Sequence, residues 1–302
     1  PLEIINEKKL LINLKYFFPN KDYSTIEKKF NKNKFFWFEK KISSENYENL
    51  MMLGDKALVP HEKLTRIYPQ KNLFSHIIGQ IDDDNNGISG LEKSLDQRLK
   101  KDEKRIKLTV DKNIQFLIRK ELIKFNNVFR TNGSAAILMD VNNGEIISIV
   151  SLPDFDPNKR EKISNLNFIN RATKGVYEFG SVFKTFTLAA GFDEKIVEPN
   201  TKFVDLPKSL TCAGFPIREY DDKIPSDLTV EQILIRSGNI GSVKIGQKIG
   251  ESNFKSFLSK IGLVDQMDFD IEEIGKPLKF NWGKCPLATA SFGHGITTTL
   301  IQ

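Results

Sequence analysis

Residues 177–184 read Tyr-Glu-Phe-Gly-Ser-Val-Phe-Lys, with Ser181 and Lys184 three positions apart at the start of an apolar stretch. The Thr-Phe-Thr-Leu-Ala-Ala that follows predicts a buried helix from Ser181, which we expect Gly191 to end. Residues three apart on a helix lie on one face, so the hydroxyl and the amine are expected to be neighbours. A lysine whose pKa is lowered by burial can take the serine proton, and a helix N-terminus favours the developing negative charge. The stretch therefore predicts a serine nucleophile with a lysine base.

The serine–lysine spacing alone is weak evidence for catalysis. The same S-x-x-K pattern recurs at Ser252-Asn-Phe-Lys255, within a predicted surface helix, where we interpret it as a chance match. A second triplet, Ser237-Gly-Asn239, can relay a proton through its hydroxyl and hold a substrate carbonyl through its amide. S-x-N also occurs at Ser44-Glu-Asn46, so order discriminates: Ser237 lies 56 residues after Ser181, between two predicted helices.

Hydrophobic periodicity around these motifs predicts an α+β protein of two domains, residues 1–105 and residues 106–302. The charged run Lys100–Arg105 is interpreted as a solvated linker between them. An Asn-Gly pair at 143–144 predicts a hairpin of strands 134–140 and 145–151. The remaining predicted elements are a strand at 106–110, a helix from an N-cap at Asp111 to about Asn127, and helices at 44–55, 229–235, 241–249 and 253–261.

Composition and charge exclude several classes of function. Hydrophobic residues make up 39% of the chain, enough to bury a core, and no apolar run reaches the roughly 18 residues that span a bilayer. The net charge of +6 is scattered, so no nucleic-acid partner is expected. Cys212 and Cys285 are interpreted as small buried hydrophobes, although the sequence leaves a bridge between them open. His76 and His294 lack the spacing of metal ligands, so no metal or other cofactor is expected.

Segment by segment, the chain resembles the class B penicillin-binding proteins. The signature S-x-x-K, S-D-N and K-T-G of penicillin-binding proteins and β-lactamases is present in its first two parts, with Gly in the middle of the second. The resemblance implies a penicillin-binding, β-lactamase-like transpeptidase domain at 106–302, with helices on both sides of an antiparallel sheet, and an N-terminal pedestal module at 1–105. The segments that carry it are 140–146, 151–158 and 170–181 in the former, 66–69, 76–79 and 87–92 in the latter, and 292–302, which is similar to the glycine-rich segment before the third motif.

The same resemblance implies a role for each motif residue. Ser181 is the acylated nucleophile, Lys184 its base, Ser237 a proton shuttle and Asn239 the contact to the substrate amide. Phe179 stands where the family usually has Pro, from which we expect altered packing and retained chemistry. No K-T-G or K-S-G follows Ser237. We therefore expect that the third motif lies beyond a C-terminal truncation and that these 302 residues are inactive alone.

The implied function is peptidoglycan D,D-transpeptidation on the D-Ala-D-Ala end of stem peptides, with β-lactams as inhibitors. A short connection between residues 92 and 108 favours the septal, cell-division subtype over the elongation subtype. Alternatives are a D,D-carboxypeptidase or β-lactamase-type hydrolase, which the pedestal and the segment 153–158 oppose, and a non-catalytic penicillin-binding sensor or scaffold. The family implies the periplasmic face of the bacterial inner membrane, an anchoring helix before Pro1, and a polytopic glycosyltransferase and division proteins as partners.

Overall fold

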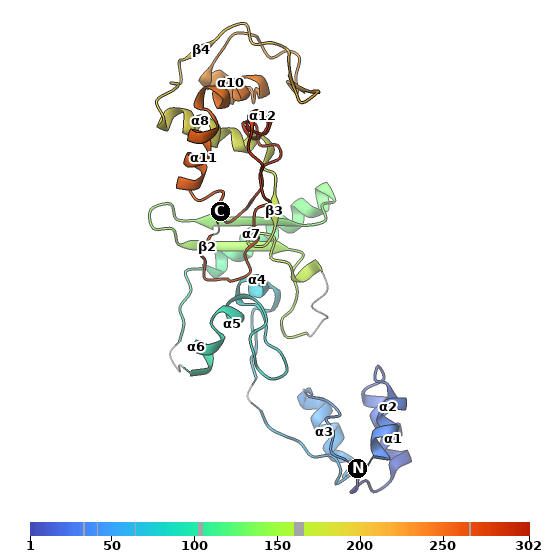
Figure 1. The fold of residues 1–302 in the computed structure, drawn as a ribbon. Coiled ribbons are helices and arrows are strands. Elements are labelled where there is room, and N and C mark those ends of the chain that lie inside the picture. The colour runs from blue at the N-terminus through green and yellow to red at the C-terminus, as the bar shows by residue number, and fades with distance from the viewer. Residues whose placement is uncertain (33, 41, 64, 102–104, 160–165, 266) are drawn as a thin grey trace. The chain divides into compact units, whose positions relative to one another are not determined.

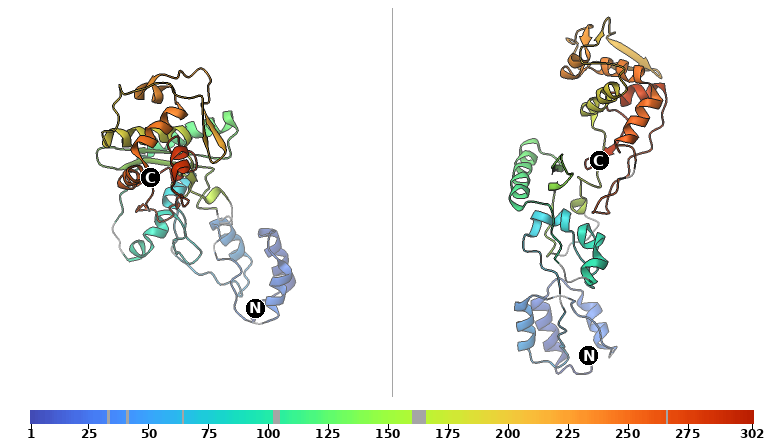
Figure 2. Two further views of the ribbon diagram at one scale, coloured as in Figure 1. Left: turned by 45° about the horizontal axis from the view of Figure 1, so that its top comes forward. Right: turned by 90° about the vertical axis from the view of Figure 1, so that its left-hand side faces the viewer.

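The computed structural model describes residues 1–32, 34–40, 42–63, 65–101, 105–159, 166–265 and 267–302. These residues form two compact units (Figures 1 and 2). The first unit comprises residues 1–67 and 81–86, and the second comprises residues 68–80 and 87–302. The linker expected at Lys100–Arg105 includes residues 102–104, which lie outside the described residues, and the domain boundary at 105 stays a prediction.

The first unit is a small cluster of three helices, α1 (Glu7–Phe17), α2 (Tyr23–Phe30) and α3 (Ser44–Met52). Each begins at a side chain that accepts backbone N–H bonds, as helix starts require. The helix predicted at 44–55 is therefore confirmed, with its end three residues earlier. The core of the unit is made of buried apolar side chains from the three helices: Leu10, Leu11, Leu14, Ile26, Phe30 and Leu50.

The second unit contains a two-stranded sheet covered by a long helix. The strands β1 (Ser134–Met139) and β2 (Ile146–Leu152) pair antiparallel, which confirms the hairpin predicted from Asn-Gly. Helix α7 (Lys112–Phe129) lies along the hairpin and begins at the predicted N-cap, Asp111, whose carboxylate accepts from Asn113 N and Ile114 N (Figure 2).

The strand predicted at 106–110 is wrong. This segment is irregular, with a bend at Thr109, and it has no ladder of backbone pairs with β2. Its contact with β2 instead uses the Thr109 hydroxyl, which donates to Ile146 O at 2.7 Å, followed by Asp111 N, which donates to Ile147 O. A side-chain hydrogen bond thus takes the place of a backbone pair.

Short helices complete the sheet region of the second unit. They are η1 (Lys71–Phe74), α4 (Ser75–Ile78), α5 (Gly90–Ser94), α6 (Asp96–Lys101) and η2 (Leu166–Phe168). A small core joins the hairpin to these segments through buried Ile77, Ile149, Ala172 and Ile301.

The rest of the second unit is helical and holds its largest core. Figure 1 shows α8, α10, α11 and α12 gathered together, away from the hairpin. Their bounds are α8 (Lys184–Asp193), α9 (Val230–Ile235), α10 (Asn239–Ile249), α11 (Glu251–Lys260) and α12 (Lys284–Ala290). Two short antiparallel pairs border them, β4 (Lys202–Phe203) with β7 (Leu228–Thr229), and β5 (Ser209–Cys212) with β6 (Phe215–Arg218).

The helices predicted at 229–235, 241–249 and 253–261 are confirmed within two residues at each end. Gly191, however, lies inside α8 and does not end it. A Cβ at this position would approach Val197 Cγ2 to 2.8 Å, so Gly191 allows close packing of the helix against the following loop. A glycine needed for packing cannot be told from a helix-ending glycine by sequence position alone.

The interpretation of the cysteines as separate small hydrophobes is wrong, because Cys212 and Cys285 form a disulfide with their Cα atoms 5.4 Å apart. The bond joins β5 to α12 across 73 residues of sequence. Closing a loop of this length restricts the unfolded chain by about 4 kcal/mol in the chain-entropy treatment. The disulfide therefore stabilises the helical region. Among the described residues, no helix combines the length and the apolar character that crossing a membrane requires.

Candidate active site

Ser181 lies in a single tight turn, the 3-10 helix η3 (Gly180–Phe183), immediately before α8. The expected α-helix thus begins three residues later than predicted, at Lys184. The Ser181 side chain is exposed, whereas Phe183 beneath it is 1% exposed. The turn therefore presents the serine to solvent on a support that is anchored in the core.

The glycine-rich segment at 292–295 holds this turn from outside α8. Gly180 N donates to Gly293 O at 3.1 Å. Gly293 has φ +85°, and a Cβ there would lie only 1.7 Å from Gly180 O. The two backbones can approach this closely only because residue 293 has no side chain. Strand β8 (Thr298–Thr299) continues the contact by pairing with β3 (Val176–Tyr177), just before the turn.

Lys184 is a buried cation beside the Ser-Gly-Asn triplet. Its side chain is 1% exposed, and Nζ donates to Ser237 O and, at 2.9 Å, to Ser237 Oγ. Burial lowers the pKa of Lys184 to about 8, although the negative charge of Glu219 opposes the shift. Within the described part of the chain, no hydrogen bond joins Lys184 to Ser181. The structure therefore brings the predicted base and shuttle together and leaves the nucleophile one turn away.

Ser237 adopts a conformation that few residues other than glycine take. Its φ of +53° lies in the left-handed region and ends α9, with Ser237 N bound to Leu234 O and Gly238 N bound to Ile233 O. This geometry costs an L-residue about 1–2 kcal/mol. Strained backbone conformations of this kind occur often at functional sites. The conformation turns both the carbonyl and the hydroxyl of Ser237 toward Lys184.

Asn239 and Glu219 fix the first turn of α10. The Asn239 side-chain amide donates to Arg218 O at 2.8 Å, so its nitrogen faces the end of β6. The Glu219 carboxylate accepts from Asn239 N at 2.6 Å and from Ile240 N at 2.9 Å. Glu219 was not predicted from the sequence, because nothing in its local sequence connects it with a triplet about twenty residues later. Gly293 was included only as part of a longer segment.

The two other motif matches belong to other elements, and Ser252 lies in a surface helix, as predicted. Ser252 is exposed on α11, and Ser44 belongs to α3 in the first unit. His294 lies at the site's edge, with Nδ1 3.1 Å from Glu178 Oε2 and a side chain that is 67% exposed. Among the described residues, no group of three or more His, Cys, Asp and Glu side chains is placed to hold a metal ion.

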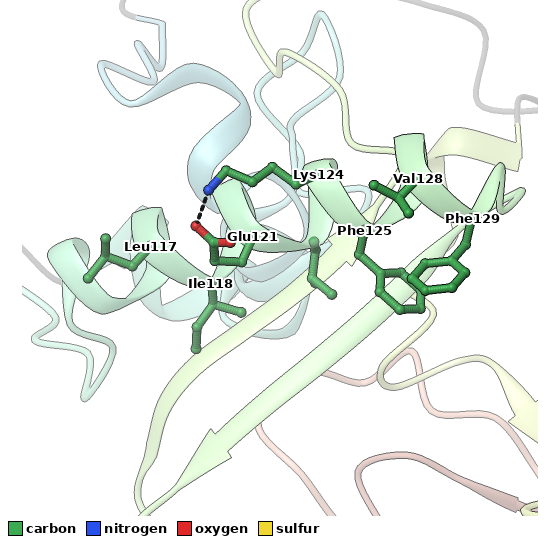
Figure 3. Close-up of a pocket in the computed structure, with 8 residues that line it drawn as sticks. Leu117, Ile118, Glu121, Lys124, Phe125, Val128 and Phe129 are labelled. Atoms are coloured by element: carbon green, nitrogen blue, oxygen red, sulfur yellow. Dashed lines mark hydrogen bonds and ion pairs between the residues drawn. The ribbon is translucent and has the colours of Figure 1, made fainter.

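An apolar groove of about 570 Å³ lies on α7, away from these residues (Figure 3). Phe125 and Phe129 lie side by side along it with ring centroids 4.5 Å apart, while Lys124 and Glu121 form an ion pair above it. None of the residues that line the groove is a predicted site residue. The predicted site residues Lys184 and Ser237 are therefore distinguished by a buried polar contact, and they lie outside the apolar groove.

The serine turn, the buried lysine and the Ser-Gly-Asn loop are accompanied by a match to a known family. Residues 134–302 match the family described as the penicillin binding protein transpeptidase domain. The chain belongs to this family. The expected resemblance to class B penicillin-binding proteins of the septal type and the α+β transpeptidase fold are thus confirmed, while the N-terminal pedestal stays a prediction.

Relatives of this family share about a quarter of the sequence. The probable peptidoglycan D,D-transpeptidase FtsI of Caulobacter vibrioides is 27% identical over 260 residues, 84% of this chain and 44% of that protein. The peptidoglycan D,D-transpeptidase FtsI of Escherichia coli is 26% identical over 302 residues, 90% of this chain and 50% of that protein. The chain thus spans about half the length of the curated relatives it matches.

A solved structure confirms the fold. Penicillin-binding protein 3 of Mycobacterium tuberculosis, complexed with ampicillin, superposes with a TM-score of 0.69 at 24% identity. The likeness covers 78% of this chain and 55% of that one. At this identity it supports the arrangement of the elements and leaves the chemistry to the residues of this chain.

Proposed function

We propose that this protein is a serine peptidoglycan D,D-transpeptidase that cross-links stem peptides through an acyl-enzyme on Ser181. The observation that carries the proposal is the buried Lys184, whose Nζ is bound to both the carbonyl and the hydroxyl of Ser237 one turn after the exposed serine. For a fully exposed lysine, only about one side chain in several thousand is neutral at pH 7. With a pKa of about 8 the neutral fraction is roughly one in ten, which supports a role as base.

We propose the following order of steps for these residues, supported by the contact of Lys184 with Ser237. Neutral Lys184 takes the proton of Ser181 Oγ, which attacks the carbonyl between the two D-Ala residues. Ser237 passes that proton from Lys184 to the departing amine, and free D-Ala leaves. The rest of the peptide stays bound to Ser181 as an ester. The amine of a second stem peptide then attacks the ester, forms the cross-link and returns a proton to Ser181. Asn239 holds the substrate amide through its side chain.

A β-lactam follows the first half of this sequence. Its strained amide offers a carbonyl to Ser181, but the leaving nitrogen stays tethered in the adduct and blocks the second amine. The ampicillin complex of the mycobacterial protein with the same fold supports this binding. The FtsI relatives support a role in septal cell wall synthesis. By family analogy, we place the protein at the periplasmic face of the inner membrane, with a polytopic glycosyltransferase and division proteins as partners.

We also propose that residues 1–302 react slowly by themselves, because no K-T-G or K-S-G triplet follows Ser237 within them. In the family, this motif supplies the cation for the substrate carboxylate and part of the oxyanion hole. Losing one oxyanion donor costs about 100- to 1,000-fold in rate. Comparing the acylation rate of this fragment with that of a form carrying the third motif tests the proposal. Equal rates would contradict it.

Labelling of the full-length protein with a fluorescent penicillin tests the assignment of the nucleophile. We expect Ser181→Ala to abolish labelling and Ser252→Ala to leave it unchanged, because Ser252 is an exposed residue of α11 with the same S-x-x-K spacing. Release of D-Ala from a stem peptide, with or without an acceptor amine, then separates cross-linking from hydrolysis. Labelling that persists in Ser181→Ala, or release that never yields a cross-link, would refute the proposal.

A further inference from the structure

The first turn of α10 is held by a carboxylate from outside both sequence motifs. Gly238, the middle residue of the triplet, has no side chain that could accept the free N–H groups at this helix start. Both N–H groups that follow, those of Asn239 and Ile240, donate to Glu219 at 2.6 and 2.9 Å. Helix α10 has eleven residues, and its next turn is buried in the core. One carboxylate thus fixes the end of the helix that carries Asn239.

Glu219 is itself well anchored. It directly follows β6, which pairs with β5 from Ser209↔Arg218 to Cys212↔Phe215. The disulfide of Cys212 with Cys285 ties this hairpin to α12. On the other side, the Asn239 side chain donates to the carbonyl of Arg218, next to Glu219. Three kinds of bond therefore locate the carboxylate relative to the triplet.

Glu219 also acts on the lysine through its charge. Burial disfavours the charged form of Lys184, and the field of Glu219 favours it, so the pKa settles at about 8. The hydroxyl and carbonyl of Ser237, which touch Nζ, are uncharged. Within the described part of the chain, Glu219 is the charged side chain whose field acts on Lys184. Glu219 thus fixes the backbone of the triplet and also stabilises the positive charge of Lys184, which is bound to Ser237 of that triplet.

We infer that Glu219 is a positioning residue for acylation: it holds the Ser237–Asn239 loop so that the Ser237 carbonyl and hydroxyl meet Lys184, and it tunes that lysine as a base. The inference rests on the acylation of Ser181 proposed above. It adds a third element to the site, contributed by the hairpin segment between the two motifs. Glu219 touches neither the predicted nucleophile nor Lys184 Nζ through a hydrogen bond, so its effect passes through the loop and through its field.

The test compares three variants of the full-length protein. Glu219→Gln removes the charge and turns one acceptor into a donor that faces an N–H group. Glu219→Asp keeps the charge with a shorter reach. Glu231→Gln removes a carboxylate from α9 that is exposed and makes no side-chain hydrogen bond among the described residues. The rate of acylation by a fluorescent penicillin is measured from about pH 6 to about pH 10, which brackets the titration of the lysine. Lysine titration by NMR and thermal unfolding accompany it.

We expect Glu219→Gln to lower the maximal acylation rate by about 10-fold, because one of the two partly buried N–H groups loses its acceptor. Removing the negative charge withdraws support from the charged lysine, so the pKa of Lys184 and the midpoint of the pH profile should both fall. Glu219→Asp should keep the midpoint and recover part of the rate. Glu231→Gln should behave as the unchanged protein.

Each other outcome decides against the inference or against the proposed function separately. A Glu219→Gln protein with the unchanged rate and midpoint overturns the inference while Ser181 acylation stands. So does a lower melting temperature with an unchanged midpoint, because that is the signature of a structural role alone. If the unchanged protein is not acylated, the proposed function fails, and the NMR titration of Lys184 still decides whether Glu219 sets its pKa.

Discussion

Two regions of the second unit, the surroundings of Lys184 and the outer face of α7, differ in which kind of side chain they bury and which they expose. Lys184, a cation, is 1% exposed, whereas the apolar side chains of Val128 and Phe129 on α7 are 73% and 64% exposed. An apolar hollow with a few polar groups is the usual first candidate for a binding site. Here the apolar groove of α7 contains no residue of either motif.

The difference teaches that a buried polar contact, and not an apolar cavity, distinguishes in the structure the site that the sequence motifs predicted. Burying an ammonium is costly unless partners satisfy it, so a cation in the core signals an arrangement kept for its chemistry. An exposed apolar face is surface that another molecule can cover. The first observation indicates a reaction, and the second indicates only an uncovered surface.

The comparison is tested most strongly by removing the buried contact. Lys184→Met and Ser237→Ala should each slow acylation of the full-length protein by about 100- to 10,000-fold, the usual loss when a positioned proton-transfer group is removed. Lys255→Met, at the other S-x-x-K match, should have no effect. Circular dichroism checks that the fold is retained. Unchanged acylation in a folded Lys184→Met protein would show that burial of this cation has no catalytic meaning.

Truncating one phenylalanine in the helical core and one on the exposed face of α7 compares the two regions directly. Phe254 of α11 is 0% exposed and Phe129 of α7 is 64% exposed. Phe254→Ala should lower the free energy of unfolding by about 3–5 kcal/mol, because it leaves a cavity in the core. Phe129→Ala should stay within about 0.5 kcal/mol, as is usual at the surface. Urea denaturation measures both, and an equal loss would mean that the α7 face is covered in solution.

The disulfide sharpens the contrast, since it belongs to the helical region alone. The Cys212→Ala, Cys285→Ala double variant should be less stable by about 2–5 kcal/mol. Hydrogen exchange should accelerate in α10 and α12 before it does in α7, because the bond ties β5 to α12. If α7 lost its protection equally, the two regions would unfold as one.

The smallest expected effect is a pH dependence of acylation. As the proposed base, Lys184 would act only when neutral, and its pKa is lowered to about 8 by burial. The rate should therefore rise about 10-fold between pH 7 and about pH 9 and then level off. Stopped-flow measurement of penicillin acylation gives this profile, with Lys255→Met as a matched control. A rate that is flat across this range would exclude titration of Lys184 as the limiting step.

Much of this was predictable from the sequence because the signals were local. The N-cap at Asp111 and the Asn-Gly hairpin each depend on neighbouring residues, and the structure contains both. The spacing of Ser181 and Lys184 predicted neighbours on one helix, whereas the structure places Ser181 in the 3-10 turn that precedes α8. That Ser181, Lys184 and Ser237 belong to one region of the fold was predicted from the order of the motifs in the family that the chain resembles.

What was not predictable depends on contacts between distant segments. Glu219 reaches α10 across about twenty residues, and Cys212 reaches Cys285 across 73. Neither distance leaves a periodic pattern in one sequence. The hydrogen bond from Thr109 to Ile146, which replaced a predicted strand, has the same origin. Long-range partners are fixed by packing, so local propensity cannot choose among them.

The close approach of Gly293 to Gly180 limits which mutations position 293 can tolerate. Every residue that can replace glycine carries a Cβ, and at position 293 that atom would lie 1.7 Å from the carbonyl oxygen of Gly180, next to Ser181. Any missense change in this codon therefore displaces the turn that holds the serine. In a library of random single substitutions selected for function, position 293 should contain only synonymous changes, and variation that tunes the site must arise at other codons.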